Sequence, residues 1–221
     1  MKFDAEKSQI VESLQNAAAV AERRQTIPIL ANVRLKTLNG KLEVTATDLE
    51  IQIKTYSELI NIEEEGETTV SARKMSELCR SLPDGEKVNF SLTSGKLTVR
   101  ANNFHADFAT ISPDDFPEIE INEELNPLKI NSSILKRVLT KTSFSMASQD
   151  VRYYLNGMLL EVQGSKINGV ATDGHRLALS SSSSVDSNLE VRNILPRKAV
   201  LELSKLLSAC LLYTSDAADD D

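Results

Sequence analysis

The chain has 221 residues, of which 41% are hydrophobic and 26% are charged, a composition typical of one or two soluble globular domains. This composition excludes a disordered chain, a collagen-like repeat and a disulfide-stapled miniprotein, and no apolar run is long enough to span a bilayer. The 25 basic and 32 acidic side chains give a net charge of −7, which taken alone argues against nucleic acid as a partner. The polar start lacks a signal core, and Cys79 and Cys210 make no disulfide framework, so we expect a cytoplasmic protein with free thiols.

Hydrophobic periodicity predicts the elements of the first half of the chain in order. A helix from Ala5 to about Glu22 comes first, and a second helix over Ala72–Leu82 has Met75, Leu78, Cys79 and Leu82 on one face. Alternating apolar residues predict strands before and after the second helix, and Asn39-Gly40 predicts a tight hairpin. The strands are expected at Asn32–Leu38, Lys41–Ala46, Ile51–Thr55, Lys87–Leu92, Lys96–Ala101 and Phe104–Ile111.

The second half repeats this order. A helix over Ser132–Ser143 comes first, and a later helix over Pro196–Leu207 begins with a proline, which suits the first turn of a helix. The serine run Ser180–Ser184 is expected to be a flexible loop. Each half is therefore predicted to be two helices packed on one side of antiparallel strands, which is the α+β class.

An internal repeat is the most informative feature of the sequence. The segment from Lys41 to Asp48 recurs from Lys166 to Asp173, with Ala-Thr-Asp at the end of both copies and an offset of 125. Ala72-Arg73-Lys74-Met75 matches Pro196-Arg197-Lys198-Ala199 at 124, and Met1-Lys2-Phe3-Asp4 matches Leu128-Lys129-Ile130-Asn131 at 127. Coincidence would explain any one match, but three in the same order at nearly one offset indicate two copies of one domain.

The repeat sets the expected domain boundaries at 1–120 and 129–208, joined by an acidic linker at 121–128. The second copy stops early, because residues 209–221 cannot supply the three strands that end the first copy. This tail carries four acids and lacks periodicity, and it resembles translated sequencing-adapter sequence. The alternative is a native, disordered acidic tail, which would leave the second domain unfinished.

Charge is segregated along the chain and on the predicted helices. The run from Asp114 to Glu124 carries six acids and no base, whereas Lys129 to Arg152 carries five bases and one acid. Arg73 and Arg80 share the polar face of one helix, and Arg137 with Lys141 lies opposite the apolar stripe of another. Arg197, Lys198 and Lys205 cluster on the last helix. A basic face is ordinarily only solvated surface, but recurrence at equivalent positions favours a shared surface for a polyanion, with phosphate contacts and no base reading.

Two long motifs carry a resemblance to a known family. The segments Gln149-Asp150-Val151-Arg152-Tyr153-Tyr154-Leu155-Asn156-Gly157-Met158 and Ala171-Thr172-Asp173-Gly174-His175-Arg176-Leu177-Ala178 resemble the bacterial sliding clamps, the beta subunits of DNA polymerase III. Shorter matches are Thr26-Ile27-Pro28-Ile29-Leu30, Asp115-Phe116-Pro117 and Leu195-Pro196-Arg197-Lys198. The resemblance covers Met1 to about Ser208 and implies tandem clamp domains of the processivity fold. In this family, two subunits of three domains each close into a ring around duplex DNA.

The resemblance also implies three sets of site residues. DNA would be contacted by Arg24, Arg73, Arg137, Gln149, Tyr153, Tyr154 and Arg197. A cleft for short partner peptides would include Leu155, Thr172, Gly174, His175, Arg176 and Leu177. The homodimer interface of the ring would use Lys74, Phe104, Ala106 and Phe108, the last three on one face of a strand.

The expected function is that of a DNA sliding clamp, loaded by an ATP-driven clamp loader, that tethers the polymerase III catalytic subunit and binds other proteins carrying a clamp-binding motif. No cofactor and no metal are expected, because two histidines and two distant cysteines give no metal spacing. A hydrolase built on Asp173, His175 and the serine run is disfavoured, since no Gly-x-Ser-x-Gly elbow exists. The alternative is a non-catalytic adaptor fragment that binds peptides without encircling DNA.

Overall fold

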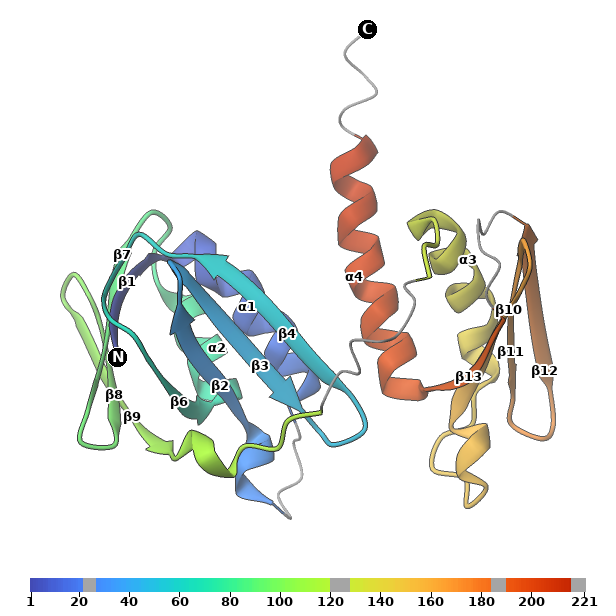
Figure 1. Ribbon diagram of the computed structural model, residues 1–221, viewed down its shortest axis with the longest axis horizontal. Helices are drawn as coiled ribbons and strands as arrows, with labels where there is room; N and C mark the ends of the chain where they lie inside the picture. The colour runs from blue at the N-terminus through green and yellow to red at the C-terminus, as the bar shows by residue number, and fades with distance from the viewer. Residues whose placement is uncertain (22–26, 120–127, 184–189, 216–221) are drawn as a thin grey trace, which may run out of the picture. The chain divides into compact units, whose positions relative to one another are not determined.

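The computed structural model describes residues 1–21, 27–119, 128–183 and 190–215, with residues 208–215 described by their backbone alone (Figure 1). The chain divides into two compact units, Met1–Glu120 and Ile121–Asp221. In each unit, helices pack on antiparallel strands, so the predicted α+β class is confirmed.

The first unit is a nine-stranded antiparallel sheet, within the part of the chain that is described, with two helices packed on it. The strand order is β4-β3-β2-β6-β9-β8-β7-β1-β5. Strand β9 joins β6 only through Thr110 and Ile111 and pairs with β8 through residues 104–109. The elements are β1 (Lys2–Glu6), α1 (Lys7–Val20), η1 (Pro28–Ala31), β2 (Asn32–Leu38), β3 (Lys41–Thr47), β4 (Gln52–Glu58), β5 (Asn61–Glu64), β6 (Gly66–Ser71), α2 (Ala72–Ser81), β7 (Lys87–Thr93), β8 (Lys96–Ala101), β9 (Phe104–Ile111) and η2 (Pro113–Asp115).

The core of the first unit lies between the sheet and its helices. The rings of Phe3 and Phe90 stack with their centroids 4.6 Å apart, and Met75 and Cys79 of α2 are fully buried. Cys79 is a free thiol, as predicted, and burial raises its pKa to about 12. The side chain of Cys210 lies outside the described residues.

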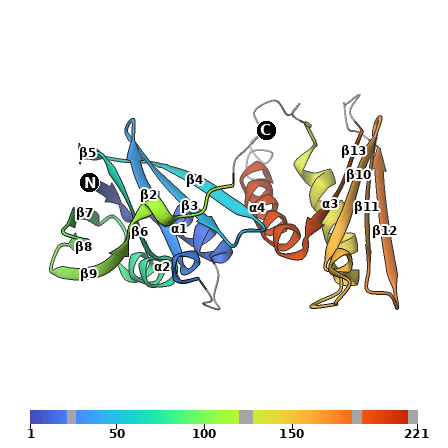
Figure 2. The same ribbon diagram turned by 60° about the horizontal axis from the view of Figure 1, so that its bottom comes forward.

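The second unit is a four-stranded sheet of order β12-β11-β10-β13, with helices packed on one face (Figures 1 and 2). Asn131 begins the first helix by accepting a 2.9 Å hydrogen bond from the Ser133 backbone N–H. Val138, Leu139, Met158 and Ile167 are fully buried between helix and sheet. The elements are α3 (Ser132–Thr142), η3 (Ser143–Ser145), η4 (Tyr153–Leu155), β10 (Gly157–Gln163), β11 (Lys166–Thr172), β12 (Leu177–Ser183), β13 (Val191–Pro196) and α4 (Arg197–Ser215).

The structure differs from the sequence-based prediction in several features, among them strands β5 and β6, which were not predicted. The serine run is not a loop within the described residues, because Ser180 and Ser182 are buried in β12 and their neighbours point outward. The first predicted helix begins only at Lys7, since Phe3 and Ala5 are buried in β1. Helix α4 continues past Leu207 to Ser215, into the segment that was expected to be a tail. The predicted hairpin is confirmed, with φ of 51° at Asn39 and 79° at Gly40.

The structure reproduces the internal repeat at the level of strand register. Arg34 lies opposite Thr45 and Thr69 in the first unit, and Leu159 lies opposite Val170 and Ile194 in the second, all at an offset of 125. The cross-strand ion pair between Lys36 and Glu67 (3.7 Å) corresponds to the pair between Glu161 and Arg192 (3.8 Å), with the two charges exchanged. The two sheets therefore share one register, although their side chains differ.

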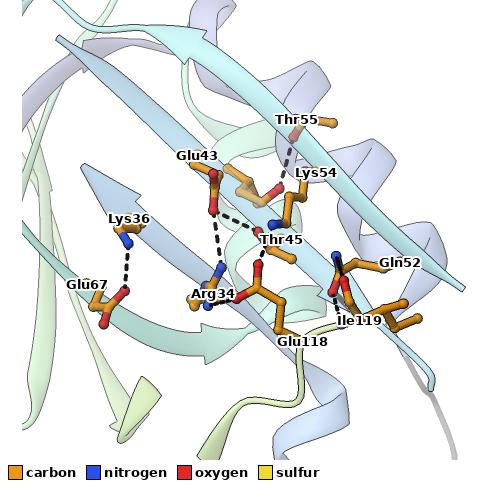
Figure 3. A network of polar contacts seen from close by, with 11 residues as sticks. Arg34, Lys36, Glu43, Thr45, Gln52, Lys54, Thr55, Glu67, Glu118 and Ile119 are labelled. Atoms are coloured by element: carbon orange, nitrogen blue, oxygen red, sulfur yellow. Dashed lines mark hydrogen bonds and ion pairs between the residues drawn. The ribbon is translucent and has the colours of Figure 1, made fainter. Parts of the chain in front are cut away.

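A strap, which we define as residues 113–119, follows β9 and covers the outer face of β2, β3 and β4 in the first unit (Figure 3). Phe116 is buried, and the Arg34 guanidinium carbon lies 5.6 Å from the centre of its ring. At the end of the strap, Gln52 Oε1 accepts a 2.9 Å hydrogen bond from the Ile119 backbone N–H. The strap is therefore held at two places, by the contact of Phe116 with Arg34 and by the hydrogen bond of the Ile119 backbone to Gln52.

Ion pairs complete the attachment of the strap. Glu118 Oε2 lies 3.0 Å from Arg34 Nη1, and Glu118 Oε1 also pairs with Lys54. Arg34 pairs in addition with Glu43 at 3.2 Å, and only 11% of its side chain is exposed. The hydrogen bonds from Arg34 and Lys54 lower the pKa of Glu118 to about 2.

Replacing Glu118 by glutamine should weaken this attachment without changing the size of the side chain. We expect Glu118→Gln to lower the free energy of unfolding of the first unit by about 1 kcal/mol at neutral pH, a value discounted for solvent screening because 38% of the side chain is exposed. Since the native pKa lies below the ordinary value of 4.5, this contribution is complete above about pH 4.5 and is lost as the pH falls through about 2. Urea unfolding followed by amide NMR signals of the first unit, repeated at several pH values, measures both effects. Glu12→Gln on the exposed side of α1 is the control, and an equal loss in both variants would contradict the role of Glu118.

Candidate nucleic-acid interface and peptide cleft

Exposed cationic side chains lie on α2 and α3, opposite the buried faces of both helices. On α2, Met75 and Cys79 face the core, whereas Arg73, Lys74 and Arg80 are exposed. The Arg73 Nε lies 2.8 Å from Glu77 Oε1 one turn along the helix, an exposed pair that salt screens readily. On α3, Val138 and Leu139 are buried and Lys141 is exposed.

Two of the predicted DNA-contacting arginines have structural partners in the second unit. Arg137 is exposed, but its Nη2 donates a 3.0 Å hydrogen bond to Ser182 Oγ on β12. Arg197, the first residue of α4, is half-buried, and its Nη1 donates to the Met146 carbonyl at 3.0 Å. Arg197 therefore also fixes the loop between α3 and β10. Arg24 lies outside the described residues.

The loop of residues 146–156 carries the other predicted DNA contacts. Its ends are joined by a hydrogen bond from the Ala147 N–H to the Leu155 carbonyl (3.0 Å). The Asn156 side chain accepts from the Asp150 N–H and donates to the Asp150 carbonyl. Gln149 is exposed with a φ of 61° at the beginning of this closed segment. The loop is therefore held in one shape by hydrogen bonds between its own residues.

The exposed aromatic side chains of this loop are Tyr153 and Tyr154. Their ring centroids lie 6.0 Å apart in an edge-to-face arrangement. Neither tyrosine packs within a strand, because both lie in the 3₁₀ helix η4 with their rings exposed. They are available for contact with a partner.

The turn between β11 and β12 is held by two side chains of the repeated Ala-Thr-Asp motif. Asp173 Oδ1 accepts from the backbone N–H groups of His175 and Arg176, both at 3.0 Å, and these hydrogen bonds lower the pKa of Asp173. Thr172 Oγ1 donates to the Arg176 carbonyl at 2.7 Å and accepts from the Gly174 N–H. Gly174 has a φ of 88°, a conformation that favours glycine.

The same turn occurs between β3 and β4 of the first unit. Asp48 Oδ1 accepts from the N–H groups of Glu50 (3.1 Å) and Ile51 (2.9 Å), and Thr47 Oγ1 donates to the Ile51 carbonyl. Threonine and aspartate therefore shape this turn in both units. The side chains that differ between the copies, at residues 174–177, give the second turn its own surface.

The loop and the turn of the second unit lie side by side. The Arg176 guanidinium lies 5.6 Å from the centre of the Phe144 ring, and a Cβ at Gly174 would be 3.1 Å from Arg152 Nη2. Arg152 in turn makes three hydrogen bonds to the Asp150 carboxylate, which lower the pKa of Asp150 to about 2. The structure thus brings the predicted DNA-contacting loop against the turn of the predicted peptide cleft.

The individual cleft residues differ in their accessibility. Leu155, near the end of the loop, is buried, whereas Leu177 is 64% exposed at the start of β12. His175 and Arg176 are exposed beside it, with Arg176 Nε 3.0 Å from Asp173 Oδ2. The hydroxyl of Thr172 is used by the turn. The sequence analysis did not identify Phe144, Asp150 and Arg152 as residues of this surface. The Asp-x-Arg spacing of the last two could have indicated their pairing.

The predicted dimer residues lie on β9 and α2. Residues 104–109 of β9 have no strand partner on their second edge within the described residues, since β6 pairs only with Thr110 and Ile111. Phe104 is exposed, whereas Ala106 and Phe108 are half-buried and Phe108 packs against the core. Lys74 is exposed on α2. Strand β9 therefore offers a backbone edge that another strand can extend.

Two further features bear on the kind of site. Among the described residues, no group of three or more histidine, cysteine, aspartate or glutamate side chains could hold a metal ion. Within the same ranges, no helix is long and apolar enough to cross a membrane.

The two halves of the chain match family models of known proteins. Residues 1–120 match the model of the DNA polymerase III beta subunit N-terminal domain, and residues 129–211 match that of its central domain. The chain is 42% identical over 209 residues to the beta sliding clamp of Pseudomonas aeruginosa and 39% identical over 207 residues to that of Escherichia coli. It covers 57% of the length of each of these relatives, which in turn match 94% of this chain.

Solved structures of sliding clamps share the fold. The P. aeruginosa clamp bound to griselimycin matches with a TM-score of 0.87 at 43% identity, over 94% of this chain and 57% of that chain. The DNA polymerase sliding clamp of Caulobacter crescentus matches with a TM-score of 0.88 at 31% identity, over 95% of this chain and 58% of that chain.

The turn between β11 and β12 should lose its shape when its central carboxylate is removed. Asp173→Ala deletes the acceptor of two backbone N–H groups and the partner of Arg176, and we expect it to destabilise the second unit by about 1 kcal/mol. It should also shift the amide resonances of residues 174–177. Asp48→Ala, which removes the corresponding acceptor from the first unit, is the matched control and should leave those resonances in place. Unchanged resonances at 174–177 in Asp173→Ala would show that other contacts hold the turn.

Proposed function

The chain belongs to the family of DNA polymerase III beta subunits, and from this membership we propose that it acts in DNA replication as a sliding clamp or as part of one. In this proposal the clamp encircles duplex DNA in the cytoplasm and tethers the polymerase III catalytic subunit, which confers processivity. A clamp loader driven by ATP places it on DNA, and the chain itself catalyses no reaction. The single observation that carries the proposal is the recurrence of exposed cationic side chains on the helices of two units that share the clamp fold.

Electrostatics supports enclosure without sequence reading. Arg73 and Arg137 are exposed on helices, and neither lies on a motif that enters a groove, so they suit contacts with phosphates. Weak contacts of this kind let a protein slide, because each is exchanged at little cost as the protein moves along the backbone. The net charge of −7 repels DNA from surfaces other than the basic faces. Gln149, Tyr153 and Tyr154 add polar contacts from a loop with a fixed shape, and Arg24 is proposed to contribute from the equivalent sequence position of the first unit.

The second unit is further proposed to bind short peptides of partner proteins. Leu177 offers an exposed apolar side chain beside Arg176 and His175, and the cation–π contact of Arg176 with Phe144 holds the guanidinium at the rim. Gly174 allows the chain to pass close to Arg152. Leu155 and Thr172 would contribute from below the surface by shaping the cleft. The partners are the polymerase, the clamp loader and other proteins with a clamp-binding motif.

The ring requires a second copy. We propose that residues 104–109 of β9 accept a strand of another subunit at their free edge, with Phe104 and Lys74 at the surface of the contact. Ala106 and Phe108 would support the strand from its inner face, since both are half-buried.

A peptide-binding adaptor is the alternative function. It would need the cleft at residues 172–177 but not the basic faces of the helices. The exposed Leu177 supports it as well as it supports a clamp. DNA binding therefore separates the two proposals.

Reversing the charge of helix-face arginines should weaken DNA binding more than the same change elsewhere. We expect Arg73→Glu combined with Arg137→Glu to lower the affinity for a fluorescein-labelled 20-base-pair duplex by about tenfold or more and to reduce the slope of log K against log [NaCl] by about 2. Fluorescence anisotropy at several NaCl concentrations measures both quantities. Lys41→Glu combined with Lys166→Glu is the control, because it changes the net charge equally at two equivalent, exposed strand positions.

Equal losses in the two double variants would show that net charge alone governs the interaction and would contradict the proposed interface. Enclosure itself is distinguished from surface binding by retention on nicked circular DNA that disappears when the same DNA is linearised. Absence of DNA binding together with an intact peptide site would favour the adaptor.

The peptide site can be tested with griselimycin, since the similar P. aeruginosa clamp binds it. We propose that griselimycin binds this chain through the surface around Leu177, and we expect Leu177→Ser to weaken binding by about tenfold, because an exposed apolar contact of this kind contributes about 1.5 kcal/mol. Isothermal titration calorimetry measures the change. Leu201→Ser, at another exposed leucine on α4, is the control and should bind as the parent chain does. Equal affinity of Leu177→Ser and the parent would exclude this surface.

A further inference from the structure

The serine run of β12 contains a hydroxyl that contacts a predicted DNA-contacting residue. Alternation along β12 turns Ser180 and Ser182 toward the helices, and Ser182 is only 9% exposed. Its hydroxyl accepts a 3.0 Å hydrogen bond from Nη2 of Arg137 on α3. Arg137 is nevertheless an exposed residue. The hydrogen bond therefore joins a buried hydroxyl of the sheet to a cation that solvent reaches.

A glycine lets α3 lie close to the sheet at this place. Helix α3 packs on β11 and β12 (Figure 1). A Cβ at Gly169 of β11 would lie 2.5 Å from Val138 Cγ1, so a larger residue would push the helix away. Val138 follows Arg137 in the helix, and Gly169 lies opposite Ser180 in the sheet. The close approach is therefore made beside the hydrogen bond between Arg137 and Ser182.

The first unit has the same strand serine with a different partner. An offset of 125 places Ser57 of β4 at the position of Ser182, and Glu12 of α1 at that of Arg137. The hydroxyl oxygens of Ser57 and Ser13 lie 2.7 Å apart, and both residues are buried. A serine at this strand position thus joins helix to sheet in both units. In the second unit, the group that it holds on the helix is a cation.

A serine can hold a guanidinium without offsetting its charge. Arg73 on α2 gives the contrast, because its Nε lies 2.8 Å from the carboxylate of Glu77. The Ser182 hydroxyl is neutral and occupies one of the N–H donors of Arg137, so the remaining donors and the whole charge stay available to phosphate oxygens. A guanidinium that is already held also loses less rotamer freedom when it binds.

We infer that Ser182 is a positioning residue for DNA binding, whose hydroxyl holds the fully charged guanidinium of Arg137 in place for contact with phosphates. The inference rests on the proposed function and adds to it a buried residue that acts through Arg137. It also gives a role to the serine run, which neither the proposed DNA interface nor the proposed cleft includes.

Removing the hydroxyl tests the inference. We expect Ser182→Ala to weaken binding of the fluorescein-labelled 20-base-pair duplex by about threefold, because the freed side chain must be ordered again on binding. Ser182→Thr keeps a hydroxyl and should bind within about 1.5-fold of the parent chain. Ser57→Ala removes the corresponding hydroxyl of the first unit and is the matched control, with no expected loss. Fluorescence anisotropy at one fixed NaCl concentration measures all four affinities.

A second background separates positioning from a general effect on the fold. In Arg137→Gln, which should itself bind at least threefold more weakly than the parent, adding Ser182→Ala should cause no further loss, since the cation is absent. Without DNA, ¹⁵N relaxation of the parent and of Ser182→Ala reports the order parameter of the Arg137 Nε–Hε bond. We expect this order parameter to fall in Ser182→Ala, while the backbone amides of α3 keep theirs.

Failure of the inference can be distinguished from failure of the proposed function. No binding of the duplex by the parent chain, or equal binding by Arg137→Gln and the parent, would contradict the proposed interface and the inference with it. Weaker binding by Arg137→Gln together with parent affinity in Ser182→Ala would overturn the inference alone. The inference is also wrong if the loss caused by Ser182→Ala persists in the Arg137→Gln background, or if the Arg137 order parameter does not change.

Discussion

The hydrogen bonds of one aspartate in each unit set the geometry on which the rest of the structure depends. Asp48 and Asp173 each accept two backbone N–H groups at the turn that joins the second and third strands of the repeat. Turn geometry fixes strand register, and a slip of one residue would move every side chain to the opposite face of the sheet. The turns therefore decide that Ser180 and Ser182 face the helices while Leu177 and Leu179 face outward. The exposure of Leu177 at the proposed cleft follows from this choice.

The repeated Ala-Thr-Asp motif is consequently a structural signal as much as a functional one. The hydroxyl of Thr172 and the carboxylate of Asp173 serve the turn, as Thr47 and Asp48 do in a unit without the cleft residues. What distinguishes the second turn is Gly174, which admits the Arg152 guanidinium, and Arg176, which lies over Phe144. Recognition at the proposed cleft would therefore depend on the residues that differ between two turns of the same shape.

Strand and helix positions with strong periodicity could be predicted from the sequence, and those set by contacts distant in sequence could not. The segments at Asn32–Leu38, Lys96–Ala101 and Phe104–Ile111 are strands with the bounds that alternation predicts. Strand β1 escaped prediction because its pairing with β7 and β5 joins residues far apart in the chain. The serine run was wrongly expected to be a loop, since buried serines gain partners such as Arg137 only once α3 is packed on the sheet. The contact of Arg152 with Gly174 likewise depends on a positive φ and on packing between two loops.

The exchanged ion pairs, Lys36 with Glu67 and Glu161 with Arg192, show what is inherited when a domain is duplicated. Opposite charges at a cross-strand position stabilise a sheet in either order, whereas two like charges in the same place destabilise it. What matters for stability at such a site is that the two charges are opposite. Either residue can therefore change its charge, provided that its partner changes as well. Two copies of one domain can in this way drift apart in surface potential, residue by residue, while every strand keeps the neighbour it had before.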